Sequence, residues 1–395
     1  MANLFDYLDW RDIDLQKTEF NEVDNLILAR LSYFPLDDLM KVDEEITVEE
    51  AYHRFQEKEQ EARILQKEDL DLFPRLAQSI RFKHLTISHF VNFLSPEEEK
   101  QFSAVTIHLP DQKMYIAYRG TDNTIVGWKE DFNMSFQELV PSQLDSVHYL
   151  EQIANHYPQK QILIGGHSKG GNLAVYAAAF CSFATKKRIL EVYNNDGPGF
   201  HESIINSQEY QEILLRIHTF LPQSSIIGRL LNHKEQTTIL KSTQTGIMQH
   251  DLYTWQVMGD HFVQDQFTNS SEFIDHTITD WLTEVSPEQR GKFIDTLFEI
   301  LNATQVQTLS EMGAKWFSSA KTILKTYQKA DEESKEIVLK TLSSLFHIAK
   351  HNIHIPKPNR KAKPISLLVN GQQENPKNLP KLVDKEKRDE TRKYR

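Results

Sequence analysis

Residues 161–180 hold a short apolar run, a glycine-flanked serine and an alanine-rich run in direct succession. The Ile-Leu-Ile run at 162–164 is typical of a strand that is buried on both faces. The run from 173 to 180 has strong helix propensity. Between them, the sequence Gly-His-Ser-Lys-Gly at 166–170 has small residues on both sides of Ser168, which let a strand and a helix approach closely. The stretch predicts a tight strand–turn–helix corner that strains the serine backbone and exposes its hydroxyl.

Strand and helix patterns alternate on both sides of this corner. We expect further strands at 103–109, 114–119, 189–194, 214–220 and 237–242, and helices at 141–157 and 201–212. Strands that alternate with helices usually pair in parallel and are covered on both faces. The fold class is therefore expected to be α/β, with a mostly parallel sheet flanked by helices.

The two ends of the chain differ from this region. Residues 1–100 are acidic and indicate an N-terminal helical elaboration, whose helices are expected at 22–31, 47–66 and 70–80. From 270 only helical patterns occur, so 270–352 is expected to be a helical module, with helices from 287, over 308–328 and over 331–348. Residues 355–395 are expected to be a basic flexible tail. The main domain is expected over 1–265.

Charge is distributed unevenly along the chain. The net charge is −11, yet residues 356–395 carry 12 Lys/Arg against 5 Asp/Glu, so the tail is at +7 and the remainder at −18. An acidic body binds nucleic acid poorly, because affinity for phosphates comes from Lys and Arg. We expect no nucleic-acid partner. A peripheral membrane contact of the basic tail with anionic lipid is an alternative to a merely solvated terminus.

Cysteine use and hydropathy indicate the compartment. The single cysteine, Cys181, excludes an internal disulfide and fits a reducing environment. No apolar run reaches the ~18 residues that a membrane span needs, and the acidic start of the chain lacks a signal-peptide pattern. A cytoplasmic protein is expected, with leaderless export as the alternative.

Several motifs together resemble class 3 (fungal-type) lipases of the α/β-hydrolase superfamily. Gly-His-Ser-Lys-Gly-Gly at 166–171 resembles their nucleophile elbow, and the segments at 118–122 and 128–132 resemble their oxyanion strand and lid base. Asn-Asn-Asp-Gly-Pro-Gly-Phe at 194–200 and Gln-His-Asp at 249–251 are similar to a bacterial, lipase-like branch of that superfamily. The resemblance covers about residues 1–265 and implies an α/β-hydrolase fold and ester hydrolysis.

A serine nucleophile needs a base that is itself oriented by an acid, and in hydrolases of this fold the chain order is serine, acid, histidine. Asp196 follows the first strand after Ser168, at the carboxyl end where α/β enzymes carry functional loops. An ordinary Asp-Gly turn is the alternative. Class 3 lipases carry the acid after the next strand, but residues 220–225 hold no carboxylate. Either Asp196 is the acid or the triad is incomplete.

The general base is expected to be His250. It lies in a polar loop, 243–251, after the last expected strand, and it completes the order Ser168, Asp196, His250. His261 is the second candidate, being slightly further along the chain.

An acyl-transfer site also needs donors for the developing oxyanion. The backbone N–H of Lys169 is expected to provide one, at the start of the helix. The resemblance implies that Thr121 provides the second, supported by Asp131, and that residues 123–128 form the base of a lid. An ordinary surface loop with one packed tryptophan, Trp128, is the alternative for that segment.

Lys169 departs from the lipase pattern, in which an apolar residue follows the serine. A cation at a helix N-terminus opposes the helix dipole. We expect the Lys169 side chain to face the mouth of the site, where it pairs with an acid such as Glu130 or favours a polar or anionic substrate group.

No cofactor or metal is expected. The chain contains neither a phosphate-binding glycine loop nor a dinucleotide fingerprint. His347, His351 and His354 share one helical face, yet no cysteine or clustered carboxylate accompanies them. Histidines near a helix C-terminus are the favoured interpretation.

The sequence thus predicts a serine esterase with a lipid or small ester as substrate and the triad Ser168, Asp196 and His250. Two alternatives belong to other classes. One is a hydrolase-fold binding protein without turnover. The other is a membrane- or partner-binding effector that acts through its helical module and basic tail.

Overall fold

The structure is a computed structural model. It describes residues 2–268 apart from 42, 59, 123 and 135, together with 285–302, 325–328, 332, 335–340 and 343. The chain divides into two compact units, Met1–Ile353 and His354–Arg395. The second unit, which contains the expected basic tail and its membrane contact, lies outside the described residues, as do most of the helices expected over 308–348.

Within the described residues, eight strands form one sheet in the order in which they occur in the chain. The strands are β1 (Ile46–Thr47), β2 (Thr86–Ser95), β3 (Lys100–Leu109), β4 (Lys113–Tyr118), β5 (Gln161–His167), β6 (Ile189–Asn195), β7 (Ile217–Pro222) and β8 (Thr237–Leu240). The pairs from β1 to β4 are antiparallel, and those from β4 to β8 are parallel. The predicted mostly parallel α/β architecture is confirmed.

Strand β2 corrects the expectation that residues 1–100 are essentially helical. It pairs with β3 across a hairpin, so its end at Ser95 leads into a β-turn and not into a helix. The register shifts between Ser88 and Val91, where His89 has a φ of 52°. This bulge breaks the two-residue alternation by which a strand is recognised in a sequence.

The N-terminal helices are α1 (Leu4–Trp10), α2 (Glu22–Leu31), α3 (Val48–Glu57) and α4 (Asp69–Gln78). Three of these four begin at a side-chain cap, and α4 begins without one. Helix α2 spans the predicted 22–31 and starts with a capping box of Asn21 and Asp24. The helix expected over 47–66 is shorter: α3 ends at Glu57, and only a 3₁₀ turn, Gln60–Arg63, follows before α4.

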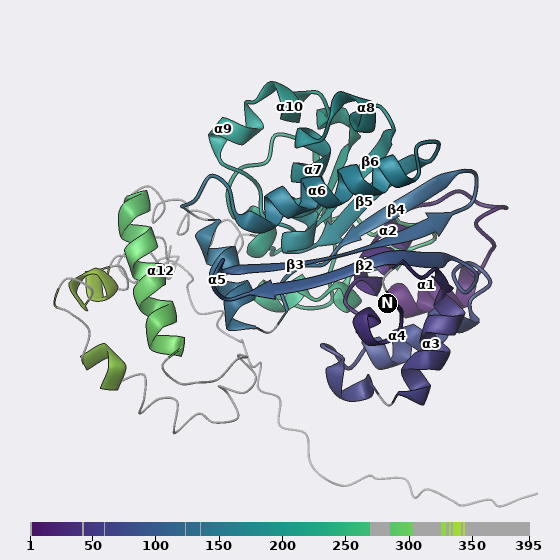
Figure 1. Cartoon of the computed structure of the whole chain (residues 1–395), viewed down its shortest axis with the longest axis horizontal. Coiled ribbons are helices and arrows are strands. Elements are labelled where there is room, and N and C mark those ends of the chain that lie inside the picture. Colours follow the sequence, from purple (N-terminus) through teal and green to yellow (C-terminus); the bar gives the residue numbers. More distant parts are fainter. Residues whose placement is uncertain are drawn as a thin grey trace, which may run out of the picture. The chain divides into compact units, whose positions relative to one another are not determined.

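Both faces of the sheet are covered (Figure 1). Along β4, Met114, Ile116 and Tyr118 belong to the apolar layer beneath α6 (Pro141–His156) and α7 (Lys169–Phe180), whereas Tyr115 and Ala117 belong to the layer beneath the N-terminal helices. Successive side chains of a strand point to opposite faces, so a continuously apolar strand is suited to this central position.

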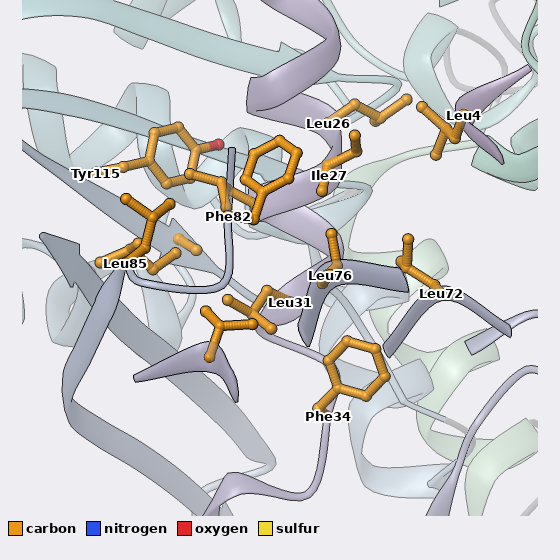
Figure 2. Packing of buried hydrophobic residues seen from close by; sticks show 14 of the residues in the cluster. Leu4, Leu26, Ile27, Leu31, Phe34, Leu72, Leu76, Phe82, Leu85 and Tyr115 are labelled. Atoms are coloured by element: carbon orange, nitrogen blue, oxygen red, sulfur yellow. The ribbon is translucent and has the colours of Figure 1, made fainter. Parts of the chain in front are cut away.

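The N-terminal helices build a continuous core with the sheet. Figure 2 shows Leu26, Ile27 and Leu31 of α2 near Leu72 and Leu76 of α4 in this cluster. Buried residues of the segment that follows β8 join the same cluster: Leu252, Tyr253, Trp255, Val257 and Phe262. The segment that carries His250 is therefore held to the body through the N-terminal elaboration.

Further described helices are α5 (Ile125–Asn133), α8 (Phe183–Lys186), α9 (Glu202–Ile205), α10 (Gln208–Gln211) and α12 (Pro287–Asn302). The single helix expected over 201–212 is thus two short ones. Helix α12 packs against α5 in a separate apolar cluster that includes Ile125, Ile294 and Phe298. Across the described part of the chain, no helix combines the length and apolar character needed to span a membrane.

Candidate active site

The corner between β5 and α7 holds Ser168 in a left-handed conformation, with φ 60° and ψ −134°. Glycines are required at 166 and 170, because other parts of the backbone lie too close to leave room for a Cβ. A Cβ at Gly166 would lie 2.3 Å from the Gly170 carbonyl carbon, and one at Gly170 would lie 2.2 Å from the Tyr118 oxygen. The serine is half-buried in an otherwise buried turn. These features are those of a nucleophile elbow, in which backbone strain presents the hydroxyl.

The structure brings two of the predicted triad residues into contact. Asp196 follows β6, is fully buried, and has a φ of 52°. Its carboxylate Oδ2 lies 2.7 Å from Nδ1 of His250. Because a carboxylate accepts, Nδ1 donates, and Nε2 of a neutral His250 is left with a free lone pair. Such a nitrogen can accept a proton from a nucleophile.

The other oxygen of Asp196 has a partner that the sequence analysis missed. The Ser225 hydroxyl donates to Oδ1 of Asp196, and the backbone N–H of Asp196 donates to the Phe220 carbonyl at 2.9 Å. Ser225 lies in the segment after β7 in which class 3 lipases would carry their acid. That segment therefore supplies a hydroxyl donor to a carboxylate that comes from the neighbouring strand.

His250 packs against the residue that precedes Ser168. The rings of His167 and His250 are 4.5 Å apart, and Nε2 of His167 donates to the His250 carbonyl at 2.8 Å. Burial, followed by the nearby His250, lowers the pKa of His167 well below its usual value, so this imidazole is neutral. No hydrogen bond joins the Ser168 hydroxyl to His250 within the described residues. Catalytic hydrogen bonds are often completed only when substrate binds.

Gln249 holds the His250 segment from both sides. Its side-chain oxygen accepts from the Ser224 N–H at 2.6 Å, its amide nitrogen donates to the Gln244 carbonyl at 2.5 Å, and its own carbonyl accepts from the Trp255 indole at 2.8 Å. Gln249 and Trp255 are both fully buried. The histidine is thus carried by a short 3₁₀ helix, Gly246–His250, that is fixed at its buried neighbour.

Thr121 and Asp131 form a hydrogen-bonded pair on the other side of the corner. The Thr121 hydroxyl donates to Oδ2 of Asp131 at 2.5 Å. Burial raises the pKa of Asp131 to about 6, although the Lys169 cation and the Thr121 hydrogen bond lower it. Lys169 is the first residue of α7, so its backbone N–H has no partner within the helix. Lys169 directly follows Ser168, and the residue before Thr121 lies close to the serine, because a Cβ at Gly120 would lie 3.0 Å from the Ser168 Cβ.

The Lys169 side chain forms the expected ion pair with Glu130 but corrects the expectation of where it lies. It does not face the mouth of the site: it is 1% exposed and lies under α5. Its Nζ donates to Glu130 at 2.8 Å, and to the backbone and side-chain oxygens of Gln101 at 2.9 and 3.1 Å. Glu130 also accepts the backbone N–H groups of Gln101 and Ser142, each at 3.0 Å. Burial removes the water that would surround the Lys169 cation. This set of acceptors replaces that water, and it is what allows the cation to be buried.

The segment expected as the base of a lid, 123–128, forms the first turn of α5, apart from residue 123, which lies outside the described chain. Trp128 packs with the cluster that α12 shares with α5. Its indole nitrogen is buried and has no hydrogen-bond partner among the described residues. Trp128 thus supports the contact with α12 and makes no described contact with the triad.

Tyr33, at the end of α2, is a second residue that the sequence analysis missed. Its hydroxyl accepts the Gly120 N–H at 2.9 Å and lies 3.3 Å from the His167 carbonyl oxygen. A Cβ at Gly120 would lie 2.3 Å from that hydroxyl, so the position admits only glycine. The tyrosine therefore bridges the residue before Thr121 to the residue before Ser168. No sequence pattern signals this contact, because Tyr33 is far from both in the chain.

The second candidate for the general base, His261, lies apart from these contacts. His261 is 68% exposed and pairs with its neighbour Asp260. Among the described residues, no group of three or more histidine, cysteine, aspartate or glutamate side chains is arranged to hold a metal ion. His347, His351 and His354 lie outside those residues.

Comparisons with known proteins give one family match and several distant structural similarities. Residues 76–299 match the family model described as Mbeg1-like. No curated protein matches the chain significantly. Solved structures that are similar include the lipase propeptide complex of Rhizomucor miehei, at 15% identity over 45% of this chain and 70% of that chain with a TM-score of 0.33. Lipase II from Rhizopus niveus is 15% identical over 40% and 67%, with a TM-score of 0.30. A mutant form of MDLA from Penicillium cyclopium is 14% identical over 62% and 86%, with a TM-score of 0.36. These similarities concern the fold alone.

Proposed function

The chain belongs to the Mbeg1-like family, and we propose that this member is a serine hydrolase that cleaves a carboxylic ester, with a lipid or acyl ester as substrate. One observation carries the proposal. A buried carboxylate, Asp196, orients His250 at 2.7 Å, and the His250 ring packs against His167, the residue before a serine held in a strained strand-to-helix turn. Strain of this kind is retained where function requires it.

The proposed mechanism uses the chain's own residues. Nε2 of His250 takes the proton as the Ser168 hydroxyl attacks the ester carbonyl, and the C–O bond then breaks as the proton passes to the leaving alcohol. Asp196 holds the imidazole in the tautomer that has Nδ1 protonated. Water, deprotonated by the same nitrogen, attacks the acyl-enzyme, releases the acid and restores Ser168.

The oxyanion is proposed to be bound by the backbone N–H groups of Lys169 and Thr121. Donors that are already aligned stabilise the tetrahedral intermediate without reorganising during the reaction. The hydrogen bond from Thr121 to Asp131 supports this role, because it fixes the threonine at one side of the corner. Asp131 acts as a positioning residue.

Two apolar side chains that are close in the chain to site residues support an acyl substrate over a polar one. Met248, two residues before His250, is 61% exposed, and Phe132, next to Asp131, is 42% exposed. Large apolar side chains at these places offer contact area to a hydrocarbon chain. The acyl group of a lipid ester is the substrate class that matches them.

Labelling with a fluorophosphonate probe tests the nucleophile. The unmodified protein is expected to be labelled, and Ser168→Ala is expected to abolish labelling. Ser203→Ala, at an exposed serine, serves as the matched control and should label normally. If Ser168→Ala is still labelled, another residue is the nucleophile. A folded, unlabelled wild type would support the alternative of a binding protein. A series of p-nitrophenyl esters of increasing chain length then reports the acyl preference.

We also propose that residues 1–265 form the hydrolase domain and 270–352 an associated helical module. The packing of α12 on α5 supports an association between the two. The basic tail, 355–395, is proposed as a contact for anionic lipid. Vesicle binding that is lost when the tail residues are neutralised would support this contact.

A further inference from the structure

A buried histidine–glutamate pair lies behind the proposed catalytic acid, in the connection between β7 and β8. Nδ1 of His233 is 2.9 Å from Oε1 of Glu235, and Nε2 is 2.6 Å from the Gly228 carbonyl oxygen. The carboxylate also accepts from the hydroxyls of Tyr210 and Thr219. The mechanism proposed above uses none of these groups.

Glu235 gathers several donors around its carboxylate. Burial alone would raise the pKa of Glu235, but hydrogen bonds from His233, Thr219 and Tyr210 lower it to about 2. The carboxylate is therefore ionised and can only accept, as can the Gly228 carbonyl oxygen. The His233 ring lies between these two acceptors, with Nδ1 facing Glu235 and Nε2 facing Gly228.

Gly228 connects this pair to the active site. Its carbonyl is held by His233, and its N–H donates to the Ser225 hydroxyl at 3.1 Å, which in turn donates to Oδ1 of Asp196. A Cβ at Gly228 would lie only 2.3 Å from that same Oδ1. The 3₁₀ turn Ile227–Arg229 thus packs directly on the carboxylate and is clamped from behind by His233.

We propose that His233 and Glu235 are positioning residues for the acid of the triad. The His233 ring fixes the Gly228 turn so that Ser225 donates to Oδ1 of Asp196, and Oδ2 then remains aimed at His250. A carboxylate without the Ser225 donor is free to rotate and to take water as its partner. The inference rests on the proposed function, since it assigns a role to groups around Asp196.

Kinetics distinguish this role from simple stabilisation. We expect Ser225→Ala and His233→Gln each to lower kcat about tenfold, the order found when a catalytic group is misplaced, with KM nearly unchanged. Because His233 acts through Ser225, the double variant should be no slower than Ser225→Ala alone. His218→Gln is the matched control: this histidine pairs with Glu191, but it is exposed and outside the network. It should retain full kcat.

If the reductions in kcat of the two single variants multiply in the double variant, the proposal is wrong. It is also wrong if His233→Gln has a normal kcat and only a lower melting temperature. A nuclear magnetic resonance readout separates this proposal from the proposed function. The resonance of the Nδ1 proton of His250 should change its chemical shift or line width in Ser225→Ala and His233→Gln but not in His218→Gln. If Ser168 is not labelled by the probe, the proposed function fails, and this resonance still tests the positioning of Asp196. An unchanged resonance in both variants contradicts it.

Discussion

At the scale of single residues, the candidate site depends on a few buried hydroxyl groups that join segments distant in the chain. Ser225 connects the segment after β7 to Asp196, and Tyr33 connects the N-terminal elaboration to the two backbone segments beside Ser168. The Tyr33 ring is held by the Arg30 guanidinium, 4.4 Å from its centroid. Each hydroxyl uses its single oxygen for more than one partner, so the loss of one atom affects two segments at once.

We predict that Tyr33→Phe reduces turnover without changing substrate binding. The change leaves the Gly120 N–H without its acceptor, which costs about 1–3 kcal/mol of stability for a buried donor. Loss of the bridge should also lower kcat about tenfold, by misplacing the oxyanion donor next to it. Steady-state kinetics and urea unfolding of both proteins measure this. Tyr52→Phe, in which the tyrosine packs on α4 from α3, is the control. Unchanged kcat in Tyr33→Phe would contradict the bridging role.

At the scale of elements, α5 is held between two neighbours. One side of the helix is anchored to α7 by the ion pair of Glu130 and Lys169, and the other side shares an apolar cluster with α12. Lys129 of α5 adds an ion pair to Asp295 of α12 at 3.0 Å. Both anchors act on the helix that carries Asp131, so the position of this helix influences the proposed oxyanion site.

The anchor between α5 and α7 predicts an asymmetric response to mutation. Lys169→Met should lower the free energy of unfolding by about 3–5 kcal/mol, because Glu130 is left as an unpaired buried charge. Adding Glu130→Gln removes that charge and should restore part of the loss. Urea unfolding of the two variants measures the difference. Lys340→Met breaks an exposed pair with Glu336 and should cost less than about 1 kcal/mol. A double variant less stable than Lys169→Met would argue against the ion-pair explanation.

At the scale of the whole molecule, stability should depend on pH through His108. Its Nδ1 accepts from Lys160 at 2.7 Å, and its Nε2 donates to the Ser88 hydroxyl at 2.7 Å. Burial, and then the Lys160 charge, lower the pKa of His108 from 6.5 to about 4. Between these two pH values, His108 is therefore protonated in the unfolded chain but neutral in the folded protein. The resulting stability is present above pH 6.5 and is lost as the pH falls towards 4.

Comparison of wild type with His108→Gln tests this dependence. From pH 7 to pH 4.5, the wild type should lose about 2–3 kcal/mol more unfolding free energy than the variant, which has no titrating group at this position. The free energy of unfolding is measured with urea at each pH. The variant lacks the hydrogen bonds of His108 at both pH values, so their loss cancels when the change between the two pH values is compared. Parallel pH curves for the two proteins would show that His108 is not the source.

Much of the fold and the candidate site could be predicted from local patterns. The corner at 166–170 and most strand positions follow from apolar runs and glycine spacing, and the chain order of Ser168, Asp196 and His250 pointed to the contact of Asp196 with His250 that the structure contains. The catalytic roles of these residues stay predictions. Strand β2 was missed because its bulge hides the alternation.

The sequence by itself determined the elements and the residues able to do acyl-transfer chemistry, because strand periodicity, helix propensity and the glycines of a tight turn act over a few neighbouring residues. Only the tertiary structure decided where Lys169 points and which hydroxyls meet Asp196 and Gly120. It also decided that the His233 ring lies behind the turn at Gly228. The physical reason is that a buried polar group without a hydrogen bond costs free energy, so buried polar groups are paired. Which partners lie within reach depends on how distant segments of the chain pack together.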